Sequence, residues 1–199
     1  MRFLILAALA LTLVACGGVS EASSSGDKLT LVAYSTPREV YAQLTKDFAK
    51  TDAGKGVSFD ESYGSSGEQS RAVEQGLPAD VVAFSLAPDV DRVVEAGLVE
   101  DTWADDEHGG MVTNSVVVFA VRKGNPQGIK TWDDLVKDGV EVIEPNPFTS
   151  GGARWNVMAA YGAQRKLGKT HEQAVEYLGE LFKHVSVQDK SARESLQTF

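Results

Sequence analysis

Cysteine, histidine and basic residues are all scarce in this chain of 199 residues. There is one cysteine, so no disulfide can form within the chain, and there are three histidines. Lysine and arginine total 19 against 28 acidic residues, which gives a formal net charge of -9 without a dense basic patch. We therefore expect no nucleic-acid partner, no metal site and no cofactor. A small anionic ligand is still compatible with this charge, because local backbone amides can hold it.

Sequence motifs of nucleophilic catalysis and nucleotide binding are missing as well. No serine lies in a Gly-x-Ser-x-Gly elbow, although the run Gly-Ser-Ser-Gly at 64–67 is one residue short of it. Neither a Gly-x-Gly-x-x-Gly nor a Walker sequence occurs. His108, His171 and His184 lie in polar or helix-flanking contexts, where histidine is more often solvated than catalytic. We predict that the chain is not an enzyme; turnover of a chromogenic phosphate or sulfate ester would contradict this.

The one cysteine, Cys16, follows a short apolar segment. Residues 3–14 are apolar but too short to span a bilayer comfortably, and the junction Leu-Val-Ala-Cys resembles a bacterial lipobox. We expect residues 1–15 to be a signal peptide and Cys16 to be lipidated, anchoring an exported protein to the outer face of the cytoplasmic membrane. A secretory leader with a chance cysteine is the alternative. Residues 16–28 are expected to form a flexible tether.

Strand and helix patterns alternate along the rest of the chain. Helix patterns follow most of the β-prone runs, and this alternation predicts an α/β fold with a mainly parallel sheet. One run, 116–121, is continuous and β-branched, which predicts a strand covered on both faces. The predicted strands are 29–33, 57–59, 79–84, 116–121, 140–143 and 185–187.

Several helix starts carry capping residues. Thr36 is predicted to cap a helix with Pro37 at its first position and Glu39 completing a capping box. The helical spacing of apolar residues predicts that this helix buries one face, made of Val40, Tyr41, Leu44 and Phe48. Further capped starts are predicted at Thr131, at Thr170 with Gln173, and at Ser191.

The stretch 149–155, Thr-Ser-Gly-Gly-Ala-Arg-Trp, joins a β-prone run to a helix. Backbone amides at such a helix start point outward with the positive end of the helix dipole behind them, so the stretch is either an anion seat or simply a capped helix. Ser66-Gly67 and Ser191-Ala192 share its chemistry. If the three converge, they can surround a tetrahedral oxyanion with backbone donors alone; otherwise they are three independent N-caps.

Four segments carry a specific resemblance. They are Ala-Asp-Val-Val at 79–82, Ser-Leu-Ala-Pro-Asp-Val-Asp at 85–91, Val-Arg-Lys-Gly-Asn-Pro at 121–126 and Asn-Pro-Phe-Thr-Ser-Gly-Gly-Ala-Arg-Trp-Asn at 146–156. They closely resemble the sulfate-binding protein family, the extracytoplasmic solute receptors of sulfate/thiosulfate ABC importers. The resemblance runs in order from Leu29 to Phe199. It implies a two-lobed periplasmic-binding-protein fold of type II, with lobe I at 29–115, a crossover or hinge strand at 116–121 and lobe II at 122–199.

The resemblance also implies a set of ligand-binding residues. Ser66 and Ala192 would each offer a backbone N–H, Ser150 would offer its hydroxyl, and Gly151 and Gly152 would offer backbone N–H groups. The ligand would be a dehydrated sulfate or thiosulfate, and the partners would be the permease subunits of the importer.

Other residues of the resemblance imply supporting roles or a missing part. Arg154 would lie behind the site, paired with Asp89, without touching the ligand. Trp155 does not match the family's ligand tryptophan, which has no counterpart before Phe199. We therefore expect an incomplete lobe II that lacks sheet strands and exposes apolar surface. We also expect weak or no sulfate binding by this chain, which micromolar or tighter binding in calorimetry would contradict.

The choice among oxyanions depends on protons. Sulfate near neutral pH has no proton to donate, so its site should present only donors, whereas phosphate calls for a carboxylate acceptor. Glu68 could serve as that acceptor, but its spacing from Ser65 predicts a capping box instead. Molybdate, tungstate and phosphate remain alternatives, as does a surface lipoprotein that binds no ligand.

Overall fold

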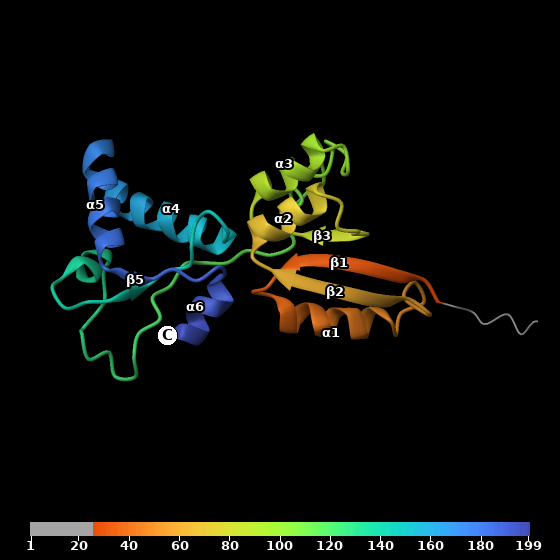
Figure 1. Ribbon diagram of the computed structural model, residues 1–199, viewed down its shortest axis with the longest axis horizontal. Helices are drawn as coiled ribbons and strands as arrows, with labels where there is room; N and C mark the ends of the chain where they lie inside the picture. Colours follow the sequence, from red (N-terminus) through yellow and green to blue (C-terminus); the bar gives the residue numbers. More distant parts are fainter. Residues whose placement is uncertain (1–25) are drawn as a thin grey trace, which may run out of the picture.

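The computed structural model describes residues 26–199, so the predicted signal peptide and Cys16 lie outside the described residues. The described part forms two groups of elements side by side (Figure 1). Lobe I holds β1 to α3 in chain order, and lobe II holds η1 to α6. The predicted boundaries at residues 115 and 122 stay a prediction.

Lobe I is built on a three-stranded parallel sheet in the order β2-β1-β3. Its strands are β1 (Lys28–Tyr34), β2 (Ser58–Gly64) and β3 (Val81–Ala83), and its helices are α1 (Arg38–Phe48), α2 (Ser66–Glu74) and α3 (Ala87–Glu95). The central strand β1 buries Val32, which packs with Val73 of α2 and Val93 of α3 into the lobe's core. The prediction of parallel pairing is therefore confirmed for this lobe.

Lobe II has a smaller sheet, in which β4 (Val142–Ile143) pairs in parallel with β5 (Val185–Val187). The helix α4 (Gly151–Lys166) packs against α5 (His171–Lys183), and the short elements η1 (Trp132–Val136) and α6 (Ala192–Thr198) complete the lobe. Thr131, Thr170 and Ser191 each cap the following helix through a capping box, which confirms these three predicted helix starts. The sparse sheet agrees with the expectation that lobe II lacks strands.

The predicted strand at 116–121 is wrong. These residues form no strand in the structure, and the side chains of Val116 and Val118 are 82% and 75% exposed. A strand needs a neighbour whose backbone groups pair with its own, and this segment pairs with neither sheet. The β-branched residues of this segment favour an extended strand locally, but the segment has no strand to pair with among the described residues.

The predicted start of α1 is also wrong in its details. Pro37 is the residue before the first helical residue, Arg38, and no side chain caps the helix. Glu39 forms no capping box with Thr36, and its carboxylate pairs with Arg193 of α6. The apolar face is not buried either: no described element covers Val40 and Leu44, although Phe48 contacts Phe59 edge-on.

Within residues 26–199, none of the helices combines the length and apolar character that crossing a membrane requires.

Candidate functional site

A small hollow lies where the carboxyl ends of strands from both lobes meet, and we call it the central hollow. Each strand, β1 to β5, is followed by a segment that reaches its wall, as expected for parallel α/β sheets. The wall is made of Tyr34, Ser35, Thr36, Gly64, Ser65, Ser66, Ser85, Ser150, Gly151, Gly152, Ser191 and Ala192. All five residues that the resemblance implies as ligands are among them.

The start of α4 touches both neighbouring helix starts. A side chain at Gly151 would place its Cβ 3.1 Å from the Cβ of Ser66, at the start of α2. A side chain at Gly152 would place its Cβ 3.2 Å from that of Ala192, at the start of α6. The three helix starts therefore converge on one hollow, and Ser150 and Ser191 also cap their helices. That these helix starts hold an anion stays a prediction.

Among the described residues, none accepts a hydrogen bond from the first amides of the three helices. Because a helix leaves its first N–H groups without an intrahelical partner, these amides must find another one. No acceptor within residues 26–199 is bonded to the backbone N–H of Ser66, Gly151, Gly152 or Ala192. Four such donors around one hollow create a positive potential without a basic side chain.

Ser150 combines a capping role with a free proton. Its Oγ accepts the backbone N–H of Ala153 at 3.2 Å, which caps α4. An accepting hydroxyl still has its own proton to donate. Ser150 is almost fully buried and lines the hollow, so a ligand there lies within reach of that proton.

The side chain of Ser66 is engaged within the protein on both its donor and its acceptor side. The Ser66 hydroxyl donates to Asp89 Oδ2 at 2.6 Å and accepts the backbone N–H of Ser85 at 2.9 Å. Asp89 is fully buried, and its other carboxylate oxygen lies 3.5 Å from Arg154 Nη1. Arg154 also donates through Nε to the carbonyl of Pro147 at 2.9 Å. Arg154 and Asp89 thus lie in contact behind the wall of the hollow.

The wall carries no charged side chain among its residues. Glu68, the candidate acceptor for a protonated ligand, is not part of the wall; its carboxylate accepts the hydroxyl of Ser65 at 2.7 Å. Ser65 is the residue before α2, as predicted, but its side chain caps no backbone N–H, so the predicted capping box is incomplete. The hollow is consequently rich in donors and free of carboxylates.

Several bonds tie the two lobes together around the hollow. The backbone N–H of Gly67 donates to the carbonyl of Thr149 at 3.0 Å, and Trp155 Nε1 donates to the carbonyl of Ser85 at 2.9 Å. Arg193 Nε donates to the carbonyl of Ser35 at 3.0 Å. The hydrogen bond from the same guanidinium also lowers the pKa of the Glu39 carboxyl. Trp155, through its bond to the Ser85 carbonyl, links the lobes, and it is not among the residues that line the hollow.

Sequence reasoning missed part of the wall. Ser35 and Thr36 follow β1, and Ser85 follows β3, yet none was predicted as a site residue. The same rule that singled out the other loops, a small polar residue just after a parallel strand, applies to each of them. Burial beside the hollow also raises the pKa of the Tyr34 hydroxyl.

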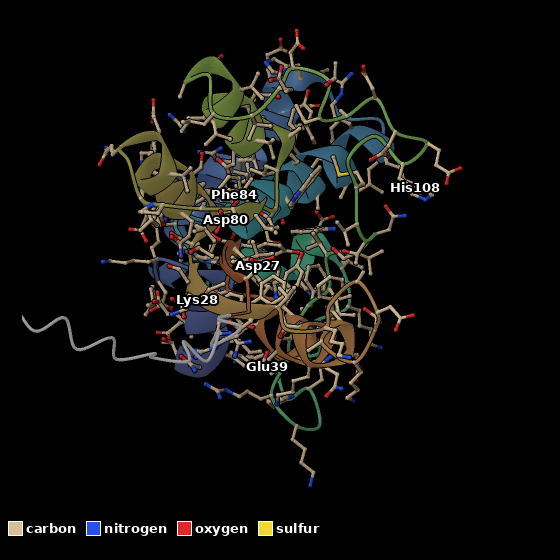
Figure 2. All side chains as sticks on the ribbon, turned by 90° about the vertical axis from the view of Figure 1, so that its right-hand side faces the viewer. Asp27, Lys28, Glu39, Asp80, Phe84 and His108 are labelled. Carbon is tan, nitrogen blue, oxygen red and sulfur yellow. The ribbon has the colours of Figure 1, made fainter. Side chains whose placement is uncertain are left out.

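The histidines lie apart from the hollow. His108 is 72% exposed and lies on an outer loop at the edge of the molecule (Figure 2). His171 contacts the hydroxyl of Tyr161 at 3.0 Å, and His184 Nδ1 lies 2.9 Å from the carbonyl of Val140. Across residues 26–199, no three His, Cys, Asp or Glu side chains gather as a metal site would require.

Two α/β lobes that meet over a donor-lined hollow at their strand ends are the architecture of a solute-binding protein. The chain belongs to the family described as bacterial extracellular solute-binding protein, which matches residues 29–199. Members of this family bind solutes and are not enzymes, so the prediction of a non-enzymatic protein is confirmed.

Individual relatives narrow the comparison. The chain is 44% identical to a sulfate-binding protein of Synechococcus elongatus, over 95% of this chain and 56% of that protein. It is 38% identical to a thiosulfate-binding protein of Pseudomonas aeruginosa, over 100% of this chain and 60% of that protein. The structure matches the sulfate-binding protein SubI from Mycobacterium tuberculosis H37Rv with a TM-score of 0.84 and 41% identity, covering 87% and 61% of the two chains.

These matches confirm the predicted resemblance to the sulfate-binding proteins and the α/β periplasmic-binding-protein fold. The chain spans little more than half the length of the curated relatives it matches.

Proposed function

We propose that this chain forms the anion-holding part of a receptor that captures sulfate or thiosulfate outside the cytoplasmic membrane. The receptor would then deliver the anion to the permease subunits of an ABC importer. One observation carries the proposal: four unpartnered backbone amides and the Ser150 hydroxyl surround one hollow whose wall has no charged side chain. The names of the relatives, sulfate-binding and thiosulfate-binding protein, support the same class of ligand.

The donor-only wall favours a fully deprotonated dianion. Every group offered to the ligand is an N–H or O–H donor, so each ligand oxygen can accept without meeting another acceptor. A protonated oxyanion such as phosphate would leave its own proton without a carboxylate, since Glu68 does not belong to the wall and its carboxylate accepts the hydroxyl of Ser65. An unmet buried donor costs affinity, so the same site should select against phosphate. Molybdate and tungstate share the shape and charge of sulfate and remain the second candidate ligands.

Arg154 and Asp89 support the site from behind in this proposal. The Asp89 carboxylate holds the Ser66 side chain, which keeps the start of α2 oriented toward the hollow. Arg154 lies against that carboxylate and against the carbonyl of Pro147, so it spans from α4 to lobe I. Neither side chain belongs to the wall, which agrees with a role that does not involve ligand contact.

The lipid anchor on Cys16 is part of the proposal. Incorporation of radioactive palmitate into the expressed chain, and its loss in a Cys16→Ala variant, would support it. A Cys16→Ala chain that remains in the membrane fraction after signal-peptide removal would contradict the anchor.

An NMR titration tests the ligand proposal, because it detects even weak binding and reports on single amides. Sulfate added to the isotope-labelled chain should shift the N–H signals of Ser66, Gly151, Gly152 and Ala192 along one saturating curve. Phosphate at the same concentration should shift them less. Chloride at matched ionic strength is the control for salt effects.

Two results would contradict the proposed receptor. Equal shifts with chloride and sulfate would show that the hollow has no preference for a tetrahedral dianion. No saturable shift with sulfate, thiosulfate, molybdate or tungstate, either in this chain or in a version extended to the full length of its relatives, would favour a surface lipoprotein without a ligand.

A further inference from the structure

Ser85 has a buried hydroxyl to which no group of the described residues 26–199 is hydrogen-bonded. Among residues 26–199, only two buried side-chain polar atoms have no hydrogen-bond partner, Ser85 Oγ and Arg92 Nε. Arg92 lies on α3 and is paired with Glu74 through another nitrogen, whereas Ser85 belongs to the wall of the central hollow. A buried hydroxyl without a partner destabilises a fold, so such a group in a binding wall calls for an explanation.

The backbone around Ser85 is held on both sides. Its N–H donates to Ser66 Oγ at 2.9 Å, within lobe I. Its carbonyl accepts Trp155 Nε1 at 2.9 Å, from α4 of lobe II. Because both peptide groups are fixed, the hydroxyl can only rotate about its own side-chain bond.

The hydroxyl lies directly against Gly151. A Cβ at position 151 would lie 1.8 Å from Ser85 Oγ, so the oxygen occupies the space that any side chain there would need. Gly151 is one of the residues whose unpartnered amide faces the hollow. The Ser85 hydroxyl and the Gly151 amide therefore reach the same part of the wall from opposite lobes.

We propose that the Ser85 hydroxyl donates a hydrogen bond to the bound tetrahedral oxyanion, in addition to the five donors already assigned. Lobe I then contributes a side-chain donor opposite Ser150 of lobe II, and the ligand completes the hydrogen bonding of a hydroxyl that the protein leaves unpaired. This inference rests on the proposed oxyanion function of the same hollow.

The variant Ser85→Ala tests the inference. Loss of one donor to a buried charged ligand should weaken sulfate binding by roughly 10- to 100-fold, measured by the NMR titration or by calorimetry. The ligand-free variant should unfold at the same or a higher temperature, because the removed hydroxyl has no partner there. Lower affinity without lower stability distinguishes a ligand contact from a structural role.

Ser62→Ala is the matched control. Ser62 is a partly buried serine of the same lobe, lies outside the wall and accepts the side-chain amide of Gln69 at 3.0 Å. Its replacement should lower stability slightly and leave sulfate affinity unchanged. Ser85→Gly provides a second variant without the hydroxyl if Ser85→Ala does not fold.

The outcomes separate this inference from the proposed function. Unchanged sulfate affinity in a folded Ser85→Ala or Ser85→Gly chain would overturn the role of Ser85 and leave the receptor proposal intact. A loss of affinity matched by a lower ligand-free unfolding temperature would also overturn it, in favour of a structural role. Absence of oxyanion binding both by the unsubstituted chain and by a version extended to the full length of its relatives would overturn both.

Discussion

At the scale of single residues, the donors that the hollow offers depend on which group of each serine, the backbone amide or the side-chain hydroxyl, is already bonded within the protein. Ser66 uses its hydroxyl to bond Asp89 and presents its amide, whereas Ser150 caps α4 and keeps its proton free. Ser85 is fixed through its backbone and presents its hydroxyl. Three residues of one type therefore serve three functions, because their hydrogen-bond partners differ.

In a receptor extended to the full length of its relatives, Ser150→Ala is expected to weaken sulfate binding by about one to two orders of magnitude, since a donor to a buried charged ligand contributes about 1.5–3 kcal/mol. Because Ser150 also caps α4, the variant should lose about 1 kcal/mol of unfolding free energy. Calorimetric titration with sulfate measures the change in affinity. Unfolding in urea measures the change in stability. Ser186→Ala, an exposed serine on β5, is the control and should change neither quantity.

Asp89→Asn is expected to lower the free energy of unfolding by about 1.5–3 kcal/mol, because a buried carboxylate accepts the Ser66 hydroxyl and contacts Arg154. Urea unfolding at neutral pH measures this. Asp91→Asn on the exposed side of the same helix should change it by less than about 0.5 kcal/mol. Equal effects of both variants would show that the network behind the hollow does not stabilise the lobe.

At the scale of elements, the links between strands and helices position the loops of the hollow. In lobe II, both oxygens of Glu144, which follows β4, lie 3.2 Å from the side-chain amide nitrogen of Asn156 on α4. Asn156 belongs to the same helix that begins with the two glycines of the hollow. The contact therefore ties the sheet of lobe II to the helix that carries most of the donors.

This link predicts a pH dependence of stability. Burial raises the pKa of Glu144 to about 7, against 4.5 for the ordinary side chain, and the amide of Asn156 offsets only part of that rise. Between these two pH values the folded protein holds a proton that the unfolded chain has released, so stability from this group falls as pH rises through the interval. Above about pH 7 both states are ionised and the contribution becomes constant.

Glu144→Gln should remove this penalty and raise the free energy of unfolding at pH 8 by roughly 1–3 kcal/mol relative to the unsubstituted chain. At pH 4 the two proteins should be nearly equally stable. Urea unfolding at both values measures the difference, with exposed Glu141→Gln as the control. If the variant is no more stable than the unsubstituted chain at pH 8, ionisation of Glu144 in the folded protein does not lower the free energy of unfolding, and the prediction is wrong.

At the scale of the whole molecule, the lobes differ in how well they cover their apolar surface. Lobe I buries a valine core between its sheet and α2 and α3, on the side of the sheet away from α1 (Figure 1). Lobe II surrounds an apolar groove of about 510 Å³ that runs from the segment 117–121 to Phe182 and Phe199. The expected exposure of apolar surface in lobe II is therefore observed.

This exposure predicts binding of an apolar dye. The fluorescent probe ANS should bind the folded chain, because it recognises exposed apolar surface. Replacing both Val116 and Val118 by threonine should reduce the signal while leaving the unfolding midpoint nearly unchanged, since both side chains are largely exposed. Undiminished ANS fluorescence in the double variant would place the dye elsewhere.

Local signals in the sequence determined the α/β alternation, three of the capped helix starts and the small-residue helix starts that line the hollow. Each of these depends on a few neighbouring residues: Thr170 with Gln173, Ser191 with Glu194, or the run Ser150 to Gly152. Such features need no knowledge of distant contacts, because capping and periodicity act within one or two turns of chain.

Only the tertiary structure decided what depends on partners far along the chain. Residues 116–121 have the composition of a strand, but they pair with neither of the two sheets. Glu39 is predicted to complete a capping box, but its carboxylate instead accepts a hydrogen bond from Arg193, 154 residues away. Ser85 is held by bonds from its backbone to Ser66 and Trp155, and its hydroxyl lies against Gly151; all three residues are distant in the sequence. Local composition describes what a residue can do, and the packing of distant segments determines which of those possibilities is realised.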